Sequence, residues 1–234
     1  TDEPKKKTEF FLNFEGVDSC FYLYINNTFA GYSQVSHMTH EFNITPLLKD
    51  GKNEMTVIVL KWCDGTYLEC QDKWRMSGIF RDVFILERSV NRIRNYKVET
   101  ENDGIVKVHL EFEGEISGKV TAVISDIEGN EVCKAETSEK DFELKIANPV
   151  LWNAENPYLY KLVLTYGNES IGEKIGFRKV EIKNGAVCVN GVPVKIKGTN
   201  RHESHPETGF YVPLDFARME LSLMKEHNIN AIRT

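Results

Sequence analysis

The sequence lacks the features of a membrane or nucleic-acid-binding protein. No apolar run approaches the roughly 20 residues of a membrane-spanning helix, and no apolar segment typical of a signal peptide stands near residue 1. A basic excess is also missing, because 29 Lys and Arg residues stand against 35 Asp and Glu residues, a net charge of −6. Contacts to phosphates need clustered Lys and Arg, so we expect a soluble protein with neither a nucleic acid nor a membrane as partner.

Cysteine pairs with metal-binding or redox spacing are absent as well. The five cysteines are odd in number, and no two of them have CxxC spacing; they are Cys20, Cys63, Cys70, Cys133 and Cys188. They stand within hydrophobic or strand-like segments, which favours buried free thiols over disulfides. Free thiols indicate a reducing, cytoplasmic compartment.

Short strands separated by turns fill the first two-thirds of the chain. Residues 8–88 contain apolar strand segments bounded by turn clusters such as Asn26-Asn27-Thr28, a pattern typical of a β-sandwich. Residues 89–182 contain six or seven further short strands, with turns at Asn102-Asp103-Gly104 and Glu128-Gly129-Asn130. This second stretch indicates an immunoglobulin-like sandwich.

The pattern changes in residues 183–234. An Asn190-Gly191 hairpin and residues 194–197 lead into a polar loop, helical spacing covers residues 215–227, Asn228 ends the helix, and residues 229–233 are typical of a buried strand. Strand, loop, helix and strand open a parallel α/β unit. Because both faces of a parallel sheet must be covered, two strands and one helix predict that the rest of a domain is missing.

The densest group of candidate site residues lies in residues 62–83, a long loop rich in aromatic and polar side chains. Aromatic faces beside carboxylates suit sugars, whose C–H faces stack on rings while their hydroxyls bond to acids. The alternative is a structural loop that packs its aromatic rings under the sandwich and pairs Glu69 or Asp72 with Arg75 or Arg81.

A second candidate, residues 197–206, contains Arg201, His202, Glu203 and His205. It stands where a barrel strand would pass into its loop, the place where active-site residues of such barrels collect. His202 and His205 have the spacing of a metal pair, although two ligands are weak evidence for zinc. Arg201 and Glu203 could form an ion pair, so catalysis, substrate contact and scaffolding all stay open. A third segment, residues 148–160, favours structure, with Trp152 and Tyr158 anchoring the sandwich.

Taken together and in this order, these segments resemble family 2 glycoside hydrolases of the bacterial β-galactosidase kind. The resemblance covers the chain from about residue 9 onward and rests on several motifs. The motifs are Phe14-Glu15-Gly16-Val17-Asp18-Ser19 with Gly31-Tyr32-Ser33; Asp64-Gly65 through Trp74-Arg75-Met76-Ser77-Gly78-Ile79-Phe80-Arg81-Asp82-Val83; Pro149, Leu151-Trp152, Glu155-Asn156-Pro157-Tyr158-Leu159-Tyr160 and Ile175-Gly176-Phe177-Arg178; and Asn190-Gly191, Lys197-Gly198, Asn200-Arg201-His202-Glu203 and Met224-Lys225 through Asn230-Ala231-Ile232-Arg233.

The resemblance implies a mainly β fold in three parts. Residues 1–88 would form a partial jelly-roll sugar-binding β-sandwich, residues 89–182 an immunoglobulin-like β-sandwich, and residues 183–234 the truncated first βαβ unit of a TIM barrel. The opening strands that the family carries before Phe10 are absent, so an exposed sheet edge could pair with another copy.

The resemblance also implies the removal of terminal β-linked galactose with retention, which needs two carboxylates about 5 Å apart. In the family both are glutamates further along the barrel, and Glu203 matches neither, so this chain holds no catalytic residue and is expected to be inactive alone. Asp72 matches an aspartate that contacts the galactosyl hydroxyls and a sodium ion. His202 matches a histidine that contacts galactose and stabilises the transition state. Magnesium would bind through residues that this chain lacks.

Three alternatives remain open. The chain could be a non-catalytic carbohydrate-binding or assembly module, or it could come from a β-glucuronidase or a β-mannosidase. The orphan βαβ opening argues against the first, and residues 74–83 favour the galactosidase branch over the other two. The resemblance further implies a parent enzyme that assembles as a homo-oligomer, often a tetramer.

Overall fold

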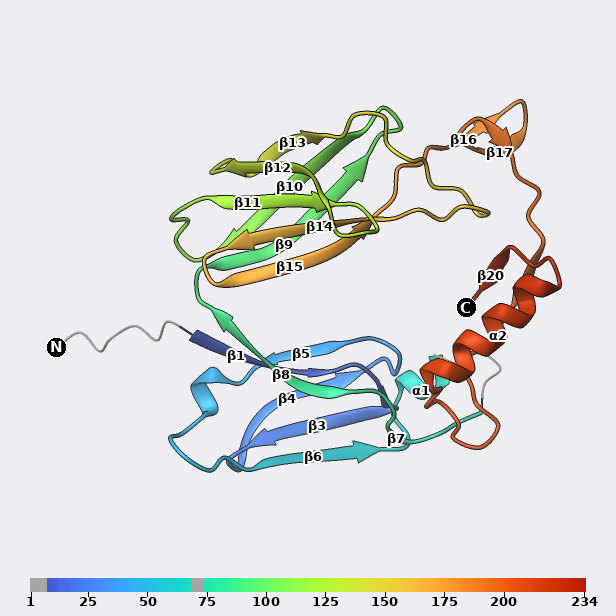
Figure 1. Cartoon of the computed structure of the whole chain (residues 1–234). Helices are drawn as coiled ribbons and strands as arrows, with labels where there is room; N and C mark the ends of the chain where they lie inside the picture. Colours follow the sequence, from blue (N-terminus) through green and yellow to red (C-terminus); the bar gives the residue numbers. More distant parts are fainter. Residues whose placement is uncertain (1–7, 69–73) are drawn as a thin grey trace. The chain divides into compact units, whose positions relative to one another are not determined.

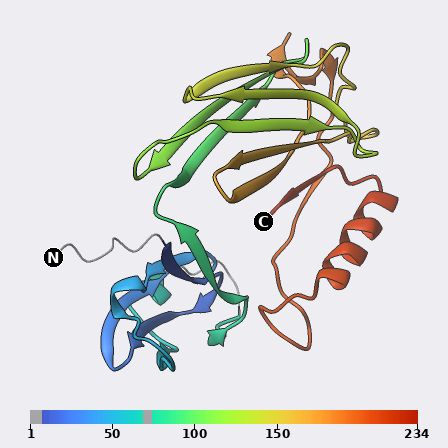
Figure 2. The ribbon, with the colours of Figure 1, turned by 60° about the vertical axis from the view of Figure 1, so that its left-hand side comes forward.

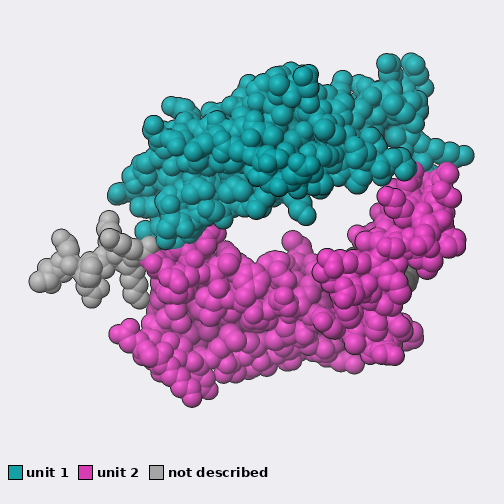
Figure 3. All heavy atoms as spheres, viewed as in Figure 1, with its two compact units in different colours: residues 1–7, 89–196 teal, residues 8–88, 197–234 magenta. Residues whose placement is uncertain are grey.

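The computed structural model describes residues 8–68 and 74–234, and strands dominate it (Figure 1). The chain forms two compact units, coloured separately in Figure 3. Unit 1 contains residues 89–196, and unit 2 combines residues 8–88 with residues 197–234. The prediction of a mainly β protein is confirmed. Among the described helices, none is both long and apolar enough to cross a membrane.

The first part of unit 2 is built from three small antiparallel sheets. Their strand orders are β5-β1-β8, β4-β3-β6 and β2-β7. The elements are β1 (Thr8–Phe14), β2 (Val17–Asp18), β3 (Cys20–Ile25), β4 (Thr28–Gln34), β5 (His40–Asn43), the 3-10 turn η1 (Thr45–Leu47), β6 (Met55–Leu60), helix α1 (Gly65–Leu68), β7 (Gly78–Ile79) and β8 (Val83–Ser89).

Alternation of apolar residues along β3 explains how this sandwich closes. Phe21, Leu23 and Ile25 are buried, whereas Tyr22 between them is exposed, because successive side chains of a strand point to opposite faces. The Phe21 ring lies 4.6 Å from that of Phe14 on β1, centroid to centroid. One face of β3 therefore packs against β1 and forms the core.

Unit 1 is a sandwich of two antiparallel sheets with strand orders β13-β10-β9 and β12-β11-β14-β15. Figures 1 and 2 show the two sheets as separate layers. The strands are β9 (Arg92–Thr100), β10 (Ile105–Glu113), β11 (Val120–Ser125), β12 (Glu131–Thr137), β13 (Asp141–Lys145), β14 (Tyr160–Tyr166) and β15 (Glu169–Ile175). The predicted strands of the immunoglobulin-like domain are all present, and β13 is an additional one.

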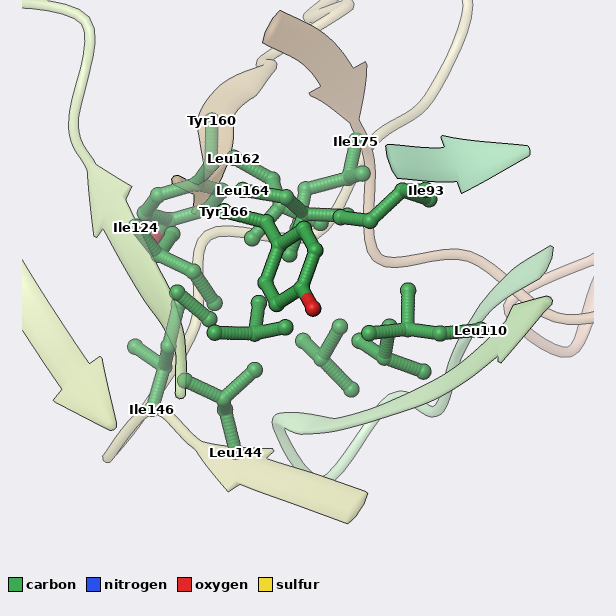
Figure 4. Packing of buried hydrophobic residues seen from close by; sticks show 14 of the residues in the cluster. Ile93, Leu110, Ile124, Leu144, Ile146, Tyr160, Leu162, Leu164, Tyr166 and Ile175 are labelled. Carbon is green, nitrogen blue, oxygen red and sulfur yellow. The ribbon is translucent and has the colours of Figure 1, made fainter. Parts of the chain in front are cut away.

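The core of unit 1 lies between these sheets and is shown in Figure 4. Leu162 and Leu164 of β14 are buried, as are Ile124 of β11 and Leu110 of β10. A tight turn on the β9–β10 hairpin is possible because Gly104 has a φ of +91°, and a Cβ there would lie 2.0 Å from the Ile146 carbonyl oxygen. The turn predicted at residues 102–104 is present, and its backbone geometry requires glycine at position 104.

The small sheet that follows the sandwich belongs to unit 1, and the parallel pair after it belongs to unit 2. A small antiparallel sheet contains β16 (Val180–Lys183), β17 (Ala186–Val189) and β18 (Val192–Pro193), and a parallel pair contains β19 (Gly198–Asn200) and β20 (Ala231–Arg233), joined through helix α2 (Leu214–Glu226). The helix is confirmed, and a final strand is present at Ala231–Arg233. The prediction that this strand is buried is wrong, because Ala231 is half-buried and Ile232 and Arg233 are exposed. The first parallel strand starts later than expected, at Gly198, because its pairing with β20 begins with Gly198 opposite Ala231.

Candidate functional site

His202 stands in the loop that follows β19, at the carboxyl end of the parallel pair. The backbone N–H of Arg201 donates to the carbonyl of Arg233 at 2.9 Å, which extends the pairing with β20 to the residue just before His202. The His202 side chain is exposed and makes no hydrogen bond with any other side chain in residues 8–68 and 74–234. The assignment of His202 as a substrate-binding residue stays a prediction.

The two neighbours of His202 are fixed by ion pairs. Glu203 lies 3.7 Å from the guanidinium of Arg201, which confirms the ion pair proposed from the sequence. Arg201 also donates to Glu220 on α2 at 2.6 and 3.1 Å. Glu203 accepts a hydrogen bond of 2.7 Å from Arg81. Four charged groups therefore connect the sandwich of unit 2, the His202 loop and α2.

His205 has a structural role in the same loop. Its Nδ1 accepts hydrogen bonds from the backbone N–H groups of Glu207 and Thr208 at 3.2 and 3.3 Å. Its ring packs edge-on against Phe216 of α2, with centroids 4.4 Å apart. Within the described ranges, no three His, Cys, Asp or Glu side chains lie close enough to hold a metal ion. His205 thus orders a turn, and the spacing of the two histidines has a structural explanation.

The aromatic loop of residues 62–83 is anchored by Arg75. Its Nη1 donates to the carbonyl oxygen of Thr66, and its guanidinium lies over the Trp62 ring at 5.7 Å from the centroid. The Thr66 hydroxyl accepts from the backbone N–H of Cys63 at 3.0 Å. Arg75 therefore joins the two sides of the segment that contains Asp72.

The other predicted site residue, Asp72, lies outside the described residues, as does Glu69. The predicted pairing of these carboxylates with Arg75 or Arg81 stays a prediction for the same reason. Arg81 instead pairs with Glu203, 122 positions further along the chain. Of the two substrate contacts expected from the sequence, the structure describes His202 alone.

A cluster of titratable groups lies on the strands next to this loop. Burial raises the pKa of the Cys20 thiol, and a hydrogen bond to Tyr32 partly offsets that effect. The pKa of the nearby Tyr32 hydroxyl is raised too, chiefly by desolvation, although the side chain as a whole is exposed and its hydroxyl donates to Gln34 Oε1 at 2.8 Å. The neutral forms are favoured, so the Cys20 thiol is poorly suited to act as a nucleophile.

The predicted free thiols are confirmed for the four cysteines that the structure describes. Cys20 and Cys188 are buried, Cys63 and Cys133 are half-buried, and all four are free. Burial was predicted for all of them and is found for two. Cys70 lies outside the described residues.

The aromatic segment of residues 148–160 belongs to the scaffold, as predicted. The Trp152 backbone N–H donates to the Phe177 carbonyl at 2.9 Å, and the Arg178 guanidinium lies 4.5 Å from the centroid of the Trp152 ring. Tyr158 packs against the core beside Tyr160. These contacts hold the end of the unit 1 sandwich together.

Sequence reasoning missed Glu220 and a group of three aromatic rings. Phe210 packs against Phe80 and His37 with centroids 5.5 and 5.1 Å apart. Glu220 occupies a helical position that spacing marks only as polar, and its partner Arg201 is 19 residues away. No local pattern predicts such pairs, because the fold alone brings them together.

Comparison with known families identifies the class of protein to which this fold belongs. The sugar binding domain of glycosyl hydrolases family 2 matches residues 2–89, a second family 2 domain matches residues 86–178, and the family 2 TIM barrel domain matches residues 180–234. The matches cover the chain from residue 2 to residue 234, and the chain therefore belongs to glycosyl hydrolase family 2.

Two relatives within the family are named β-galactosidase. The chain is 47% identical to a β-galactosidase of Actinobacillus pleuropneumoniae over 233 residues, which are 99% of this chain and 23% of that protein. It is 44% identical to a β-galactosidase of Staphylococcus xylosus over 237 residues, 100% of this chain and 24% of that protein. The chain thus spans about a quarter of the length of these relatives.

Among solved structures, a β-glucuronidase from Ruminococcus gnavus in complex with D-glucaro 1,5-lactone is similar with a TM-score of 0.84. The identity is 25%, and the match covers 98% of this chain and 43% of that one. Both kinds of relative are glycosidases, and the higher identity lies on the β-galactosidase side.

Proposed function

We propose that this chain supplies the sugar-binding and scaffold domains of a retaining exo-β-galactosidase that removes terminal, non-reducing β-D-galactosyl residues from lactose-type substrates. The observation that carries the proposal is the 47% identity to a β-galactosidase over 99% of the chain. The exposed His202, fixed through both of its neighbours, supports it.

In this proposal His202 contacts galactose and stabilises the transition state. A neutral imidazole can accept a hydrogen bond from a sugar hydroxyl, and that bond strengthens as positive charge develops on the sugar ring and makes its hydroxyls better donors. Because Arg201 and Glu203 are already paired, little reorganisation is needed when the sugar binds. The rest of the retaining chemistry depends on a carboxylate pair about 5 Å apart, which we assign to glutamates outside this chain.

Asp72 is proposed as the second sugar contact, through hydrogen bonds from galactosyl hydroxyls. Its carboxylate would also be a sodium ligand, since hard cations prefer oxygen ligands. Magnesium would bind the parent enzyme through residues that this chain does not contain. A bound sodium ion would add a fixed positive charge beside the sugar.

Two further properties of the parent enzyme follow from the same assignment. We propose that it assembles as a homo-oligomer, a tetramer in the family pattern, and that it works in the cytoplasm. The four free thiols support a reducing compartment, in which disulfides do not persist.

The specific rival is β-glucuronidase, favoured by the structural similarity to the R. gnavus enzyme. A chimera separates the two. The A. pleuropneumoniae β-galactosidase is made with its aligned segment replaced by this chain, and a matched control carries the corresponding segment of the R. gnavus β-glucuronidase. The chimera is expected to hydrolyse an aryl β-galactoside, whereas the control is not, because its sugar contacts come from another branch. An inactive chimera that is folded and correctly assembled would contradict the proposal.

The chain alone is expected to show no turnover, because the assigned carboxylate pair is not among its residues. The test uses chain prepared in a host without its own β-galactosidase and the same aryl β-galactoside. Measurable turnover by such a sample would place catalytic groups within these residues.

A further inference from the structure

Glu203 makes contacts that its role in an ion pair with Arg201 does not require. One carboxylate oxygen, Oε2, accepts from Arg81 Nη2 at 2.7 Å, and the other, Oε1, lies 3.7 Å from Arg201 Nη1. Arg201 is nearly buried, with 9% of its side chain exposed, and it is bound from its other side by Glu220 at 2.6 Å. Glu203 is therefore the one described carboxylate that joins the sandwich to the start of the His202 loop.

The same loop is anchored a second time, seven residues further on. Phe210 packs on Phe80, the residue next to Arg81, with ring centroids 5.5 Å apart. The Arg81 guanidinium lies over the Phe80 ring at 5.6 Å. Phe80 is held in turn by a backbone hydrogen bond of 3.1 Å to the carbonyl of Gly16. The loop is therefore held at Glu203 by Arg81 and at Phe210 by Phe80, two consecutive residues of the sandwich.

His202 directly precedes the first of these two anchors. The backbone N–H of Ser204 donates to the His202 carbonyl at 3.0 Å, which makes a tight turn centred on Glu203. The side chains of Arg201 and Glu203 face each other, and the imidazole between them is exposed. A change in the Glu203 contacts would therefore move the imidazole of the adjacent residue.

We propose that Glu203, held by Arg81, is a positioning residue that fixes the His202 imidazole for the sugar. The effect of Glu203 on catalysis rests on the proposed function, whereas its effect on the order of the His202 loop does not. Replacing Glu203 by Gln keeps its size but removes the charge, so Arg81 and Arg201 lose their shared counter-ion. A looser imidazole loses transition-state contact more than ground-state contact.

The first experiment measures loop order in the 234-residue chain by NMR, through heteronuclear NOEs of residues 201–205 and the imidazole signals of His202. The variants are Glu203→Gln and Arg81→Met, and Arg81→Lys serves as the conservative rescue. Glu181→Gln is the matched control, because it removes a comparable ion pair, Glu181–Lys179 at 2.9 Å, in unit 1. Loss of order in the first two variants, recovered in Arg81→Lys, supports the proposal. Unchanged order at His202 in correctly folded Glu203→Gln and Arg81→Met overturns it.

The second experiment places the same substitutions in the chimeric enzyme. Glu203→Gln and Arg81→Met are expected to lower kcat by about 10²-fold with little change in KM, the size that a displacement of about 1 Å in a reacting group produces. The double variant is expected to lose no more than Glu203→Gln alone, because Glu203→Gln already breaks the contact that Arg81→Met removes. Full activity in Glu203→Gln overturns the positioning role. An unsubstituted chimera without activity refutes the proposed function instead, and the NMR experiment then decides the role of Glu203.

Discussion

Truncation of Leu162 in the core of unit 1 is expected to lower the free energy of unfolding of this unit markedly. The Leu162 side chain is fully buried, and it lies on β14, which is paired on both sides: Leu162 is opposite Ile124 of β11 and Glu173 of β15 (Figure 4). Leu162→Ala removes three carbon groups, which is about 2.4 kcal/mol at roughly 0.8 kcal/mol per buried methylene. The cavity adds to this cost, because a strand paired on both sides cannot move in to fill it. We expect a loss of about 3 kcal/mol in the free energy of unfolding of unit 1.

The assay follows urea unfolding through Trp152, the tryptophan of unit 1. Trp62 and Trp74 are both exposed and are replaced by Phe in the background, so the fluorescence reports this unit alone. The matched control is Ile182→Ala, because the Ile182 side chain is 81% exposed, and a change below about 0.5 kcal/mol is expected there. A Leu162→Ala loss below about 1 kcal/mol, or one equal to the control, would refute the packing described.

Three further predictions concern titration, turn geometry and thiol reactivity. A hydrogen bond to Glu173 raises the pKa of Tyr96. The stabilising effect of this hydrogen bond is complete below about pH 10 and is lost as pH rises through the raised pKa. Between pH 9 and 12 the Tm should therefore fall more steeply in the unmodified chain than in Tyr96→Phe, and parallel curves would contradict this. Gly104→Ala should destabilise unit 1 by more than about 1 kcal/mol in the same urea assay. The φ of Gly104 is +91°, and the added Cβ would clash with the Ile146 carbonyl oxygen. An unchanged urea midpoint would argue against the turn described at Gly104. The Cys20 thiol is buried and its pKa is raised, so Cys20 should react with Ellman's reagent at pH 8 only when the chain unfolds. Mass spectrometry of the labelled native chain checks this. Rapid labelling of Cys20 in the native chain would contradict its burial.

Much of the fold could be predicted because its signals are local. Alternating apolar residues and turn glycines identified most strands of unit 1, and the turns predicted at residues 102–104 and 128–130 lie between β9 and β10 and between β11 and β12. The strand β13 was missed, although Phe142 and Leu144 alternate there with charged residues, because it is short and most of its side chains are polar. The start of β19 was misplaced because a parallel strand begins where its partner begins, which depends on β20.

The candidate site was predictable only in part, for the opposite reason. His202 and the Arg201–Glu203 pair belong to one short motif, and the structure places them together as expected. The pairs Arg81–Glu203 and Arg201–Glu220 join residues that are far apart in the chain. No spacing rule predicts contacts between residues so far apart in the chain, so only the structure shows how Arg201 and Glu203, the neighbours of His202, are held.

The most direct test of the central claim compares two histidines of the same loop in the chimeric enzyme. His202→Asn removes the proposed sugar contact, whereas His205→Asn keeps a side-chain acceptor for the backbone N–H groups of Glu207 and Thr208. We predict that kcat/KM for an aryl β-galactoside falls by about 10²- to 10³-fold in His202→Asn, the range seen when one hydrogen bond to the transition state is lost. We expect nearly unchanged activity in His205→Asn. Equal activity in the two variants would contradict the assignment of His202 to the sugar site.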